Sequence, residues 1–278
     1  MHSLFDSVAI KCSKITTLSY STSFSLGIRT LDKKYRDPIY SIYGFVRFAD
    51  EIVDTFHEQD KAQLLKEFKS DTYRAIQNKL SLNPILHSFQ LVVNKYKIER
   101  ELIDCFLNSM EMDLNPHLYD REKYETYILG SAEVVGLMCL RVFCEGDEQN
   151  YQSLKPQAMR LGAAYQKINF LRDMKADYFS LGRAYFPQLD IEKFDIGAKK
   201  EIEMEIDNDF QEGLNGIRKL PKGSRFGVYV SFVYYYRLFN KIQSLSPDRI
   251  LNQRIRISDS KKYALILTSF LRHKLNII

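Results

Sequence analysis

Two groups of polar residues repeat at helical spacing, and we call them the first and second acidic stripes. The first stripe, with steps of four, three and four residues, consists of Tyr43, Arg47, Asp50 and Asp54. The second stripe, with steps of three, four and four residues, consists of Gln166, Asn169, Asp173 and Asp177. At about 3.6 residues per turn, the members of each stripe lie along one face of an α-helix.

Carboxylates in this arrangement could hold metal ions. Each stripe is embedded in apolar sequence, so its helix should turn the polar face toward a cavity rather than toward a dry core. Unpaired acids buried together would repel one another and take up protons. Carboxylate oxygens are preferred ligands of Mg²⁺, an ion that usually also binds a substrate phosphate. The two stripes therefore predict a Mg²⁺-dependent diphosphate site, where Arg47 offsets further phosphate charge.

A single Asp-x-x-x-Asp pair would be weak evidence, because a chain with 35 acidic residues also forms such pairs on solvated faces. Two stripes that are each continued by amide, Tyr or Arg residues favour a functional site. Loss of a metal-bound diphosphate from an allylic carbon leaves a carbocation, which requires a dry pocket and is stabilised by aromatic faces. The 18 Phe and 18 Tyr residues could line that pocket.

Helical periodicity extends along almost the whole chain and indicates which elements position the stripes. We expect helices at residues 3–17, 38–57, 60–79, 84–95, 99–113, 121–145, 151–179, 195–219, 225–245 and 259–274. All seven prolines fall at or near these boundaries, where proline is tolerated. Because no long alternating run and no linker is found, residues 1–278 are predicted to form one all-α domain.

The composition excludes several other classes of protein. With 45% hydrophobic and 27% charged residues, the chain is typical of a soluble globular protein and not of a disordered one. No charge-free stretch reaches about eighteen residues and the N-terminus lacks a signal-peptide pattern, which predicts a cytoplasmic protein without a transmembrane helix. The four cysteines and five histidines show no metal-binding spacing.

The net charge of +5 is concentrated toward the C-terminal end. Residues 249–278 contain seven Lys or Arg residues and one acid, Asp259. Such a segment suits phosphate groups, an anionic membrane surface or nucleic acid, and a solvated basic face explains the charge equally well. A nucleic-acid binder is disfavoured because the sequence contains no recognised nucleic-acid-binding module.

Several segments resemble motifs of the squalene/phytoene synthases, a family of head-to-head prenyltransferases. DEIVD (50–54) and QKINFLRDMKAD (166–177) are similar to the family's two aspartate-rich motifs, and the second fits Q-x-x-N-x-x-R-D-x-x-x-D at every position. Further similar segments are YSTSF (20–24), YILGSAEVVG (127–136), GRAYFP (182–187) and RIRISDSKK (254–262). The resemblance covers about residues 19–262, and Leu129 and Glu133 depart from the residues common in the family.

The resemblance implies an isoprenoid synthase fold, a helical bundle around a central cavity, and a role for each matching residue. Mg²⁺, which Mn²⁺ can replace, would be bound by Asp50, Asp54, Asp173 and Asp177. Diphosphate would be contacted by Arg47, Arg172, Arg183 and Arg254. Substrate would also be bound by Ser21, Ser23, Gln166 and Asn169. The residues implied in catalysis are Tyr43, Arg47, Tyr127, Arg172 and Tyr185, of which Tyr127 and Tyr185 would stabilise cationic intermediates.

The implied reaction joins two prenyl diphosphates through a cyclopropylcarbinyl diphosphate. The compact length without a hydrophobic C-terminal anchor resembles bacterial carotenoid enzymes, and the Gly-x-Gly-x-x-Gly turn of dinucleotide sites is missing. We therefore expect a phytoene synthase that uses two geranylgeranyl diphosphates and no NADPH. The alternatives are a squalene or dehydrosqualene synthase acting on farnesyl diphosphate, and a catalytically inactive helical assembly or adaptor protein.

The implied partners follow from this chemistry. They are the prenyl diphosphate substrates and, for release of a very apolar product, the inner face of a membrane, which the basic C-terminal segment would touch peripherally. No nucleic-acid partner is expected.

Overall fold

The computed structural model describes residues 3–114, 119–181, 183–187, 194–257 and 269. The prediction of an all-α fold is confirmed, because the described residues contain no β-strand. Their one extended contact is an isolated bridge at Ala184, whose carbonyl oxygen accepts a hydrogen bond from the Tyr119 N–H at 3.4 Å. The helix expected at 259–274 lies outside the described residues except for Ser269.

The described helices follow one another along the chain with short connections. They are α1 (Ser3–Tyr20), α2 (Thr22–Arg29), α3 (Lys33–Asp54), α4 (Lys61–Asn78), α5 (Pro84–Tyr96), α6 (Arg100–Met112), α7 (Arg121–Ile128), the π-helical turn η1 (Leu129–Glu133), α8 (Val134–Cys144), α9 (Glu148–Leu181), α10 (Ile196–Lys219), α11 (Lys222–Gln243) and α12 (Pro247–Asn252).

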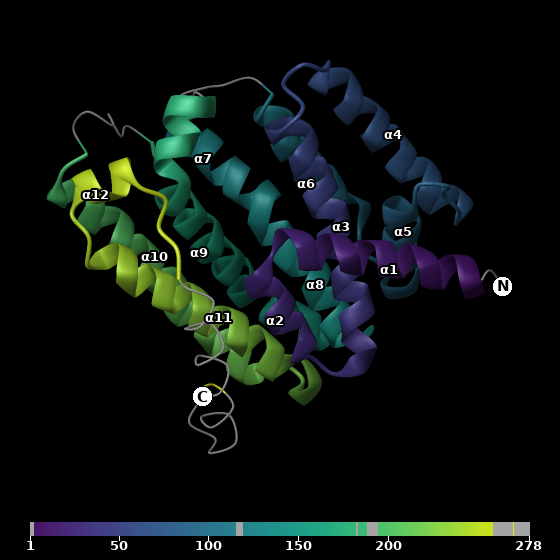
Figure 1. The fold of residues 1–278 in the computed structure, drawn as a ribbon. Coiled ribbons are helices and arrows are strands. Elements are labelled where there is room, and N and C mark those ends of the chain that lie inside the picture. Colours follow the sequence, from purple (N-terminus) through teal and green to yellow (C-terminus); the bar gives the residue numbers. More distant parts are fainter. Residues whose placement is uncertain (1–2, 115–118, 182, 188–193, 258–268, 270–278) are drawn as a thin grey trace.

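The helices form two groups on either side of α7 and α8, which run through the middle of the bundle (Figure 1). One group consists of α1, α3, α4, α5 and α6, and the other consists of α9, α10, α11 and α12. The short helix α2 packs against α3 of the first group and against α11 of the second. The helices that carry the two acidic stripes, α3 and α9, therefore belong to different groups.

Each stripe helix is fixed through a face other than the one that carries its stripe. On α3, Phe45 is fully buried and stacks on Phe89 of α5, with 3.8 Å between ring centroids. On α9, the buried Lys167 makes an ion pair of 2.6 Å with Asp209 of α10, which is also buried. These contacts leave the polar faces of α3 and α9 free to line a shared space.

Pro38 and Pro156 lie inside helices, contrary to the prediction that every proline falls at or near a boundary. α3 begins five residues before Pro38, and α9 begins eight residues before Pro156. A proline inside a helix removes one backbone hydrogen bond. Burial on the N-terminal side offsets this cost, because Tyr35 is 2% exposed and Tyr151 is 1% exposed.

Helices α2 and α12 are not among those expected from the sequence. Each is eight residues or fewer, too short for helical periodicity to be distinct. Their starts are nevertheless encoded locally. The Ser21 hydroxyl oxygen accepts a hydrogen bond from the Phe24 N–H at 3.1 Å at the start of α2, and Pro247 occupies the first turn of α12.

The helix predicted at 121–145 contains the π-helical turn η1, which packs tightly between α6 and α9. A Cβ atom on Gly130 would lie 2.6 Å from the Cys105 carbonyl oxygen of α6. A Cβ atom on Gly162 of α9 would lie 2.7 Å from the Ala132 carbonyl oxygen. Two glycines thus permit the close approach, and π-helical turns of this kind often occur beside functional sites.

One segment of the described chain, Arg121–Cys144, is long and apolar enough to cross a membrane by length and composition alone. The sequence search for a charge-free stretch did not select this segment, because Glu133 divides it near the middle and Arg141 lies toward its end. In the structure 56% of its apolar window is buried, and it lies in the middle of the bundle (Figure 1). This placement is typical of a core helix.

Replacing Gly130 with Ala should destabilise the protein by about 2 kcal/mol, because the new methyl group would meet backbone of α6 that cannot move aside. Gly197→Ala is the matched control, since a Cβ atom there meets only the flexible Asp195 side chain. Urea unfolding of both variants checks this. Equal stability of Gly130→Ala and the wild type would show that η1 can move away from α6.

Candidate active site

A cavity of about 480 Å³ is lined by α3 on one side and α9 on the other. Its polar end, which we call the mouth, is lined by Tyr20, Ser21, Tyr43, Arg47, Asp50, Gln166, Asn169, Arg172 and Arg254. Its interior is apolar and includes Ile28, Leu31, Ile42, Val135, Leu140, Phe143, Leu161, Ile217 and Leu220. Such a cavity suits a ligand with a charged head and a long apolar chain.

The first acidic stripe enters the mouth from α3. Tyr43, Arg47 and Asp50 line the cavity, and Asp54 stands at the last residue of the helix, outside the cavity lining. Arg47 makes an ion pair of 2.9 Å with Asp50 and a second one with Glu51. These contacts hold the guanidinium group at the mouth while no ligand competes for it.

Aromatic side chains support this arm of the site. The Arg47 guanidinium lies over the Tyr20 ring, 4.4 Å from its centroid. The Tyr43 hydroxyl is hydrogen bonded to Ser21, and burial raises the pKa of Tyr43 above its ordinary value. Tyr20 and Glu51 are partners of Arg47 that the sequence analysis did not select.

The second acidic stripe enters the mouth from α9. Gln166, Asn169 and Arg172 line the cavity, and the Asn169 amide nitrogen donates a hydrogen bond to the Gln166 side-chain oxygen at 3.3 Å. Asp173 accepts a hydrogen bond of 3.0 Å from Arg172 Nε. Asp177, one turn further on, lines a small adjoining pocket with Arg183 and Tyr185.

Arg254 reaches the same mouth from the segment after α12. Its Nε lies 2.7 Å from Asp173 Oδ1, although its side chain is 53% exposed. Lys175 holds the end of α12 nearby, since its ammonium group donates to the Asn252 carbonyl oxygen at 3.1 Å. Two of the predicted substrate-binding residues do not line the cavity. Ser23 lies on α2 outside the lining, and Arg183 lines the small adjoining pocket instead.

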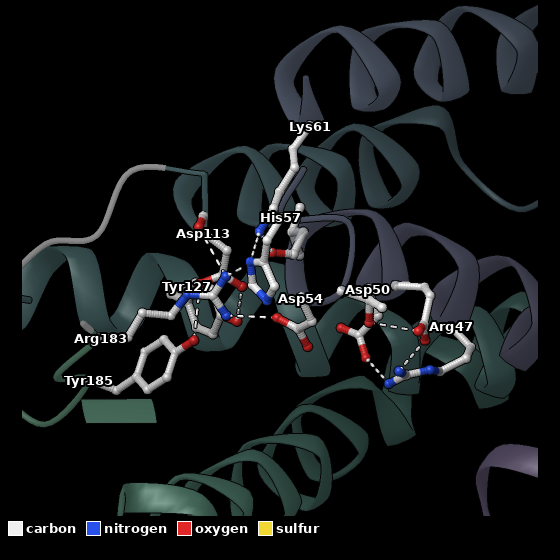
Figure 2. Close-up of polar contacts among 12 residues, drawn as sticks. Arg47, Asp50, Asp54, His57, Lys61, Asp113, Tyr127, Arg183 and Tyr185 are labelled. Carbon is white, nitrogen blue, oxygen red and sulfur yellow. Dashed lines mark hydrogen bonds and ion pairs between the residues drawn. The ribbon is translucent and has the colours of Figure 1, made fainter. Parts of the chain in front are cut away.

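Arg183 connects the end of α3 to the end of α6 (Figure 2). Its guanidinium is almost fully buried and makes an ion pair of 2.8 Å with Asp54. The same group donates to the Val53 carbonyl oxygen at 3.3 Å and to the Asp113 carbonyl oxygen at 3.0 Å. Arg183 thereby fixes the position of Asp54 beside the mouth.

Asp113 is the buried residue of this network that the sequence analysis missed. It caps the end of α6, and its carboxylate accepts hydrogen bonds from the Tyr127 hydroxyl at 2.6 Å and the Tyr185 hydroxyl at 3.0 Å (Figure 2). Arg183 Nε lies 3.5 Å from the same carboxylate. One carboxylate therefore positions the two tyrosines implied in cation stabilisation, whose ring centroids are 4.9 Å apart.

The carboxyl groups of the site shift one another's acidity. Removal from water, together with the nearby charge of Asp54, raises the pKa of Asp50 to about 7. Removal from water and the charge of Asp173 raise the pKa of Asp177 to about 7. Removal from water also raises the pKa of Asp113, to about 6. Because Asp54 also raises the pKa of Asp177, carboxylates from α3 and α9 repel one another across the mouth.

Four aromatic residues line the cavity just inside the mouth. Tyr165 and Tyr235 stack with 4.1 Å between ring centroids, and Phe24 lies within 6.3 Å of both and 5.8 Å from Tyr43. Aromatic faces attract positive charge that is shielded from water. This cluster borders the apolar interior, next to the charged mouth.

The donor groups at the mouth fit Mg²⁺. Among the residues that the structure describes, no three His, Cys, Asp or Glu side chains lie close enough to hold a metal ion by themselves. Mg²⁺ does not require such a cage, because it usually keeps water ligands and binds one or two carboxylates together with substrate phosphate. The mutual repulsion of Asp50, Asp54 and Asp177 indicates that a cation would be bound favourably here.

A family model described as squalene/phytoene synthase matches residues 18–261. Phytoene synthase 1, chloroplastic, from Solanum lycopersicum is 24% identical over 91% of this chain and 65% of its own length. A presqualene diphosphate synthase from Sinorhizobium fredii is 30% identical over 60% of this chain and 58% of its own length. The chain spans less than two thirds of the length of these two relatives, and it spans 88% of a 24% identical phytoene synthase from Arthrospira platensis.

Solved structures share the fold. A dehydrosqualene synthase bound to a ligand superposes with a TM-score of 0.83 at 20% identity, over 97% of this chain and 98% of the other. The squalene synthase HpnC from Alicyclobacillus acidocaldarius superposes with a TM-score of 0.73 at 21% identity, over 84% of this chain and 93% of the other. The expected isoprenoid synthase fold is thus confirmed.

Asp113→Asn should destabilise the protein by about 3 kcal/mol, because it removes the charge that balances the buried Arg183 while keeping the size of the side chain. Asp37→Asn, at an exposed position on α3, is the control and should change the free energy of unfolding by less than about 0.5 kcal/mol. Chemical denaturation measures both. Equal effects of the two substitutions would contradict a charge-balancing role for Asp113.

The raised pKa values of Asp50 and Asp177 predict a pH dependence of metal binding. In the metal-free protein these carboxyls contribute stability at low pH that is lost as pH rises from their ordinary value of 3.8 through about 7. Because Mg²⁺ competes with the same protons, the increase in Tm that Mg²⁺ causes should be larger at about pH 8 than at about pH 6.

Calorimetry with and without Mg²⁺ at both pH values measures this difference. The double variant Asp50→Asn/Asp177→Asn, which has no proton to exchange at these positions, should lose most of the Mg²⁺ effect at either pH. An increase in Tm that is the same at both pH values in the wild type would contradict the prediction.

Proposed function

The chain belongs to the squalene/phytoene synthase family, and we propose that it is a Mg²⁺-dependent prenyltransferase that joins two prenyl diphosphates head to head. The observation that carries this proposal is a cavity that combines acidic and basic groups at its mouth with an apolar interior. The charged mouth fits a diphosphate, and the interior fits the attached hydrocarbon chain.

In this proposal the four aspartates of the two stripes would hold Mg²⁺: Asp50, Asp54, Asp173 and Asp177. There it would offset the charge of the diphosphate and make it a better leaving group. Arg47, Arg172 and Arg254, which pair with carboxylates in the structure, would turn toward phosphate oxygens when the substrate arrives. Because each arginine would exchange a carboxylate partner for a phosphate partner, its charge would stay paired before and after the substrate binds.

Departure of the diphosphate leaves an allylic cation next to the aromatic cluster of Phe24, Tyr43, Tyr165 and Tyr235. Their faces would stabilise the positive charge, and the apolar interior would exclude water that would otherwise quench it. The double bond of a second prenyl diphosphate then attacks the cation and forms a cyclopropylcarbinyl diphosphate.

Tyr127 and Tyr185 are proposed to act on the second cation, which forms when this intermediate loses its diphosphate and rearranges. Both hydroxyl groups donate hydrogen bonds to Asp113, which leaves oxygen lone pairs and ring faces available. Burial and the charge of Asp113 raise the pKa of both tyrosines, so they remain neutral. Only Tyr127 lines the main cavity, and Tyr185 lies behind it, in the smaller pocket.

We infer that the substrate is geranylgeranyl diphosphate and that the product is phytoene, formed by loss of a proton without NADPH. Relatives named phytoene synthase, which match about nine tenths of the chain, support this choice. Farnesyl diphosphate is the alternative substrate, with squalene or dehydrosqualene as product. It is supported equally by the likeness to solved structures of a dehydrosqualene synthase and a squalene synthase.

The deciding experiment is incubation of the purified protein with C15 or C20 prenyl diphosphate and Mg²⁺, with and without NADPH, followed by identification of the hydrocarbon. We expect phytoene from the C20 substrate and no effect of NADPH on rate or product. Dehydrosqualene from the C15 substrate alone would correct the chain length, and squalene that requires NADPH would overturn the assignment.

Asp173→Ala should lower kcat by about a hundredfold or more, because the lost ligand acts on charge that develops as the diphosphate leaves. Asp37→Ala, on the same helix as the first stripe but away from the cavity, should leave kcat unchanged. Steady-state kinetics with circular dichroism of both variants measures this. Near-normal turnover of Asp173→Ala would show that the second stripe is structural.

A further inference from the structure

α1 turns three large apolar side chains toward solvent, and the residues that it buries fully are small. Leu4 is 77% exposed, Val8 is 45% exposed and Ile15 is 63% exposed. The residues of α1 that are buried are Ala9, Ser13 and Thr17. A surface helix usually has the reverse arrangement, with its large apolar residues facing the core.

The exposed apolar residues of α1 share one face. Their spacings of four and seven residues place them along one line, which also contains the exposed Lys11. We call Leu4, Val8, Lys11 and Ile15 the outer stripe of α1. The line extends over about 16 Å, at about 1.5 Å per residue.

The inner face of α1 is closely packed, so the outer stripe cannot simply rotate inward. Ser13 lies against Gly44 of α3, where an added Cβ atom would be 2.8 Å from the Ser13 hydroxyl oxygen. The same hydroxyl is hydrogen bonded to Ser88 of α5 at 2.6 Å. This packing keeps the large apolar side chains of α1 in solvent.

The charges of α1 favour an anionic partner. Lys11 and Lys14 are exposed, and the single acid of the helix is Asp6. Asp6 is engaged by His87, whose Nε2 lies 2.8 Å from its carboxylate. Apolar side chains with lysines beside them are typical of helices that lie in the interface of a membrane containing anionic lipid.

The outer stripe suits a second copy of the chain less well. A two-fold symmetric contact through the stripe would bring Lys11 of both copies together without a free acid on α1 to offset their charge. Three apolar side chains also provide far less area than the roughly 800 Å² per partner of a stable protein interface.

α1 also leads to the cavity. The helix lies on the outside of the bundle (Figure 1) and ends at Tyr20, which lines the mouth. We infer that the outer stripe of α1 docks the protein on the surface of a lipid bilayer that contains anionic lipid. This inference depends on the surface of α1 and not on the proposed function, and it places a helix that borders the mouth at the membrane surface.

Co-sedimentation of the full-length protein with vesicles tests the docking. Binding should be stronger to vesicles of phosphatidylcholine and phosphatidylglycerol than to vesicles of phosphatidylcholine alone, and added salt should weaken it. Ile15→Glu should weaken binding to the mixed vesicles by about tenfold or more, because one anchoring side chain is replaced by a charge that anionic lipid repels.

Met204→Glu is the matched control, since Met204 is 67% exposed on α10, away from the outer stripe. It should bind as the wild type does, whereas Lys11→Glu should lose affinity mainly for the mixed vesicles. Thermal unfolding confirms that each variant is folded, and turnover in detergent-free buffer should be unchanged in all three. Retained turnover separates this test from that of the proposed function.

Several results would overturn the inference. One is wild-type protein that stays in solution with both kinds of vesicle. Another is binding by Ile15→Glu and Lys11→Glu that is as tight as that of Met204→Glu. A wild-type dimer in analytical ultracentrifugation that Ile15→Glu converts to a monomer would identify a second copy as the partner of the stripe.

Discussion

Repulsion among carboxylates at the mouth of the cavity is the constraint on which the rest of the site depends. Partial burial raises the pKa of both Asp50 and Asp177 to about 7, and a second carboxylate adds to the shift, Asp54 beside Asp50 and Asp173 beside Asp177. Arginines from four parts of the chain offset this charge: Arg47, Arg172, Arg183 and Arg254. The site therefore contains both groups that a metal–diphosphate complex needs, and they neutralise each other until it binds.

The fold combines a polar mouth with a tightly packed helical bundle, because each stripe helix has one face that packs against its neighbours and another that lines the cavity with polar groups. α3 buries Phe45 among aromatic rings on one side and presents Asp50 on the other. α9 holds α10 through the buried Lys167 and presents Asn169 to the cavity. Other helices supply the apolar walls of the cavity, among them α8 with Val135, Leu140 and Phe143.

The sequence predicts the helices and the two stripes well, since both follow from a repeat of about 3.6 residues. Asp113 could not be found in this way. It stands alone at the end of α6, and its partners Tyr127, Arg183 and Tyr185 come from segments that only the folded chain brings together. Asp113 is important because it is buried and because it contacts residues distant in sequence. Neither property produces a regular spacing in the sequence.

The prediction that prolines mark helix boundaries was wrong where tertiary packing outweighs the local preference of proline. Pro38 lies inside α3 because burial of Tyr35 extends the helix toward the N-terminus.

The π-helical turn η1 was not predicted for another reason, since one added residue hardly changes the apolar pattern of a long helix. That added residue has a consequence for how such a site can change. It rotates everything before η1 by about 100° around the helix axis relative to α8. Deletion of a single codon in η1 would restore an ordinary helix and turn Tyr127 away from Asp113, with every aspartate of the two stripes still encoded.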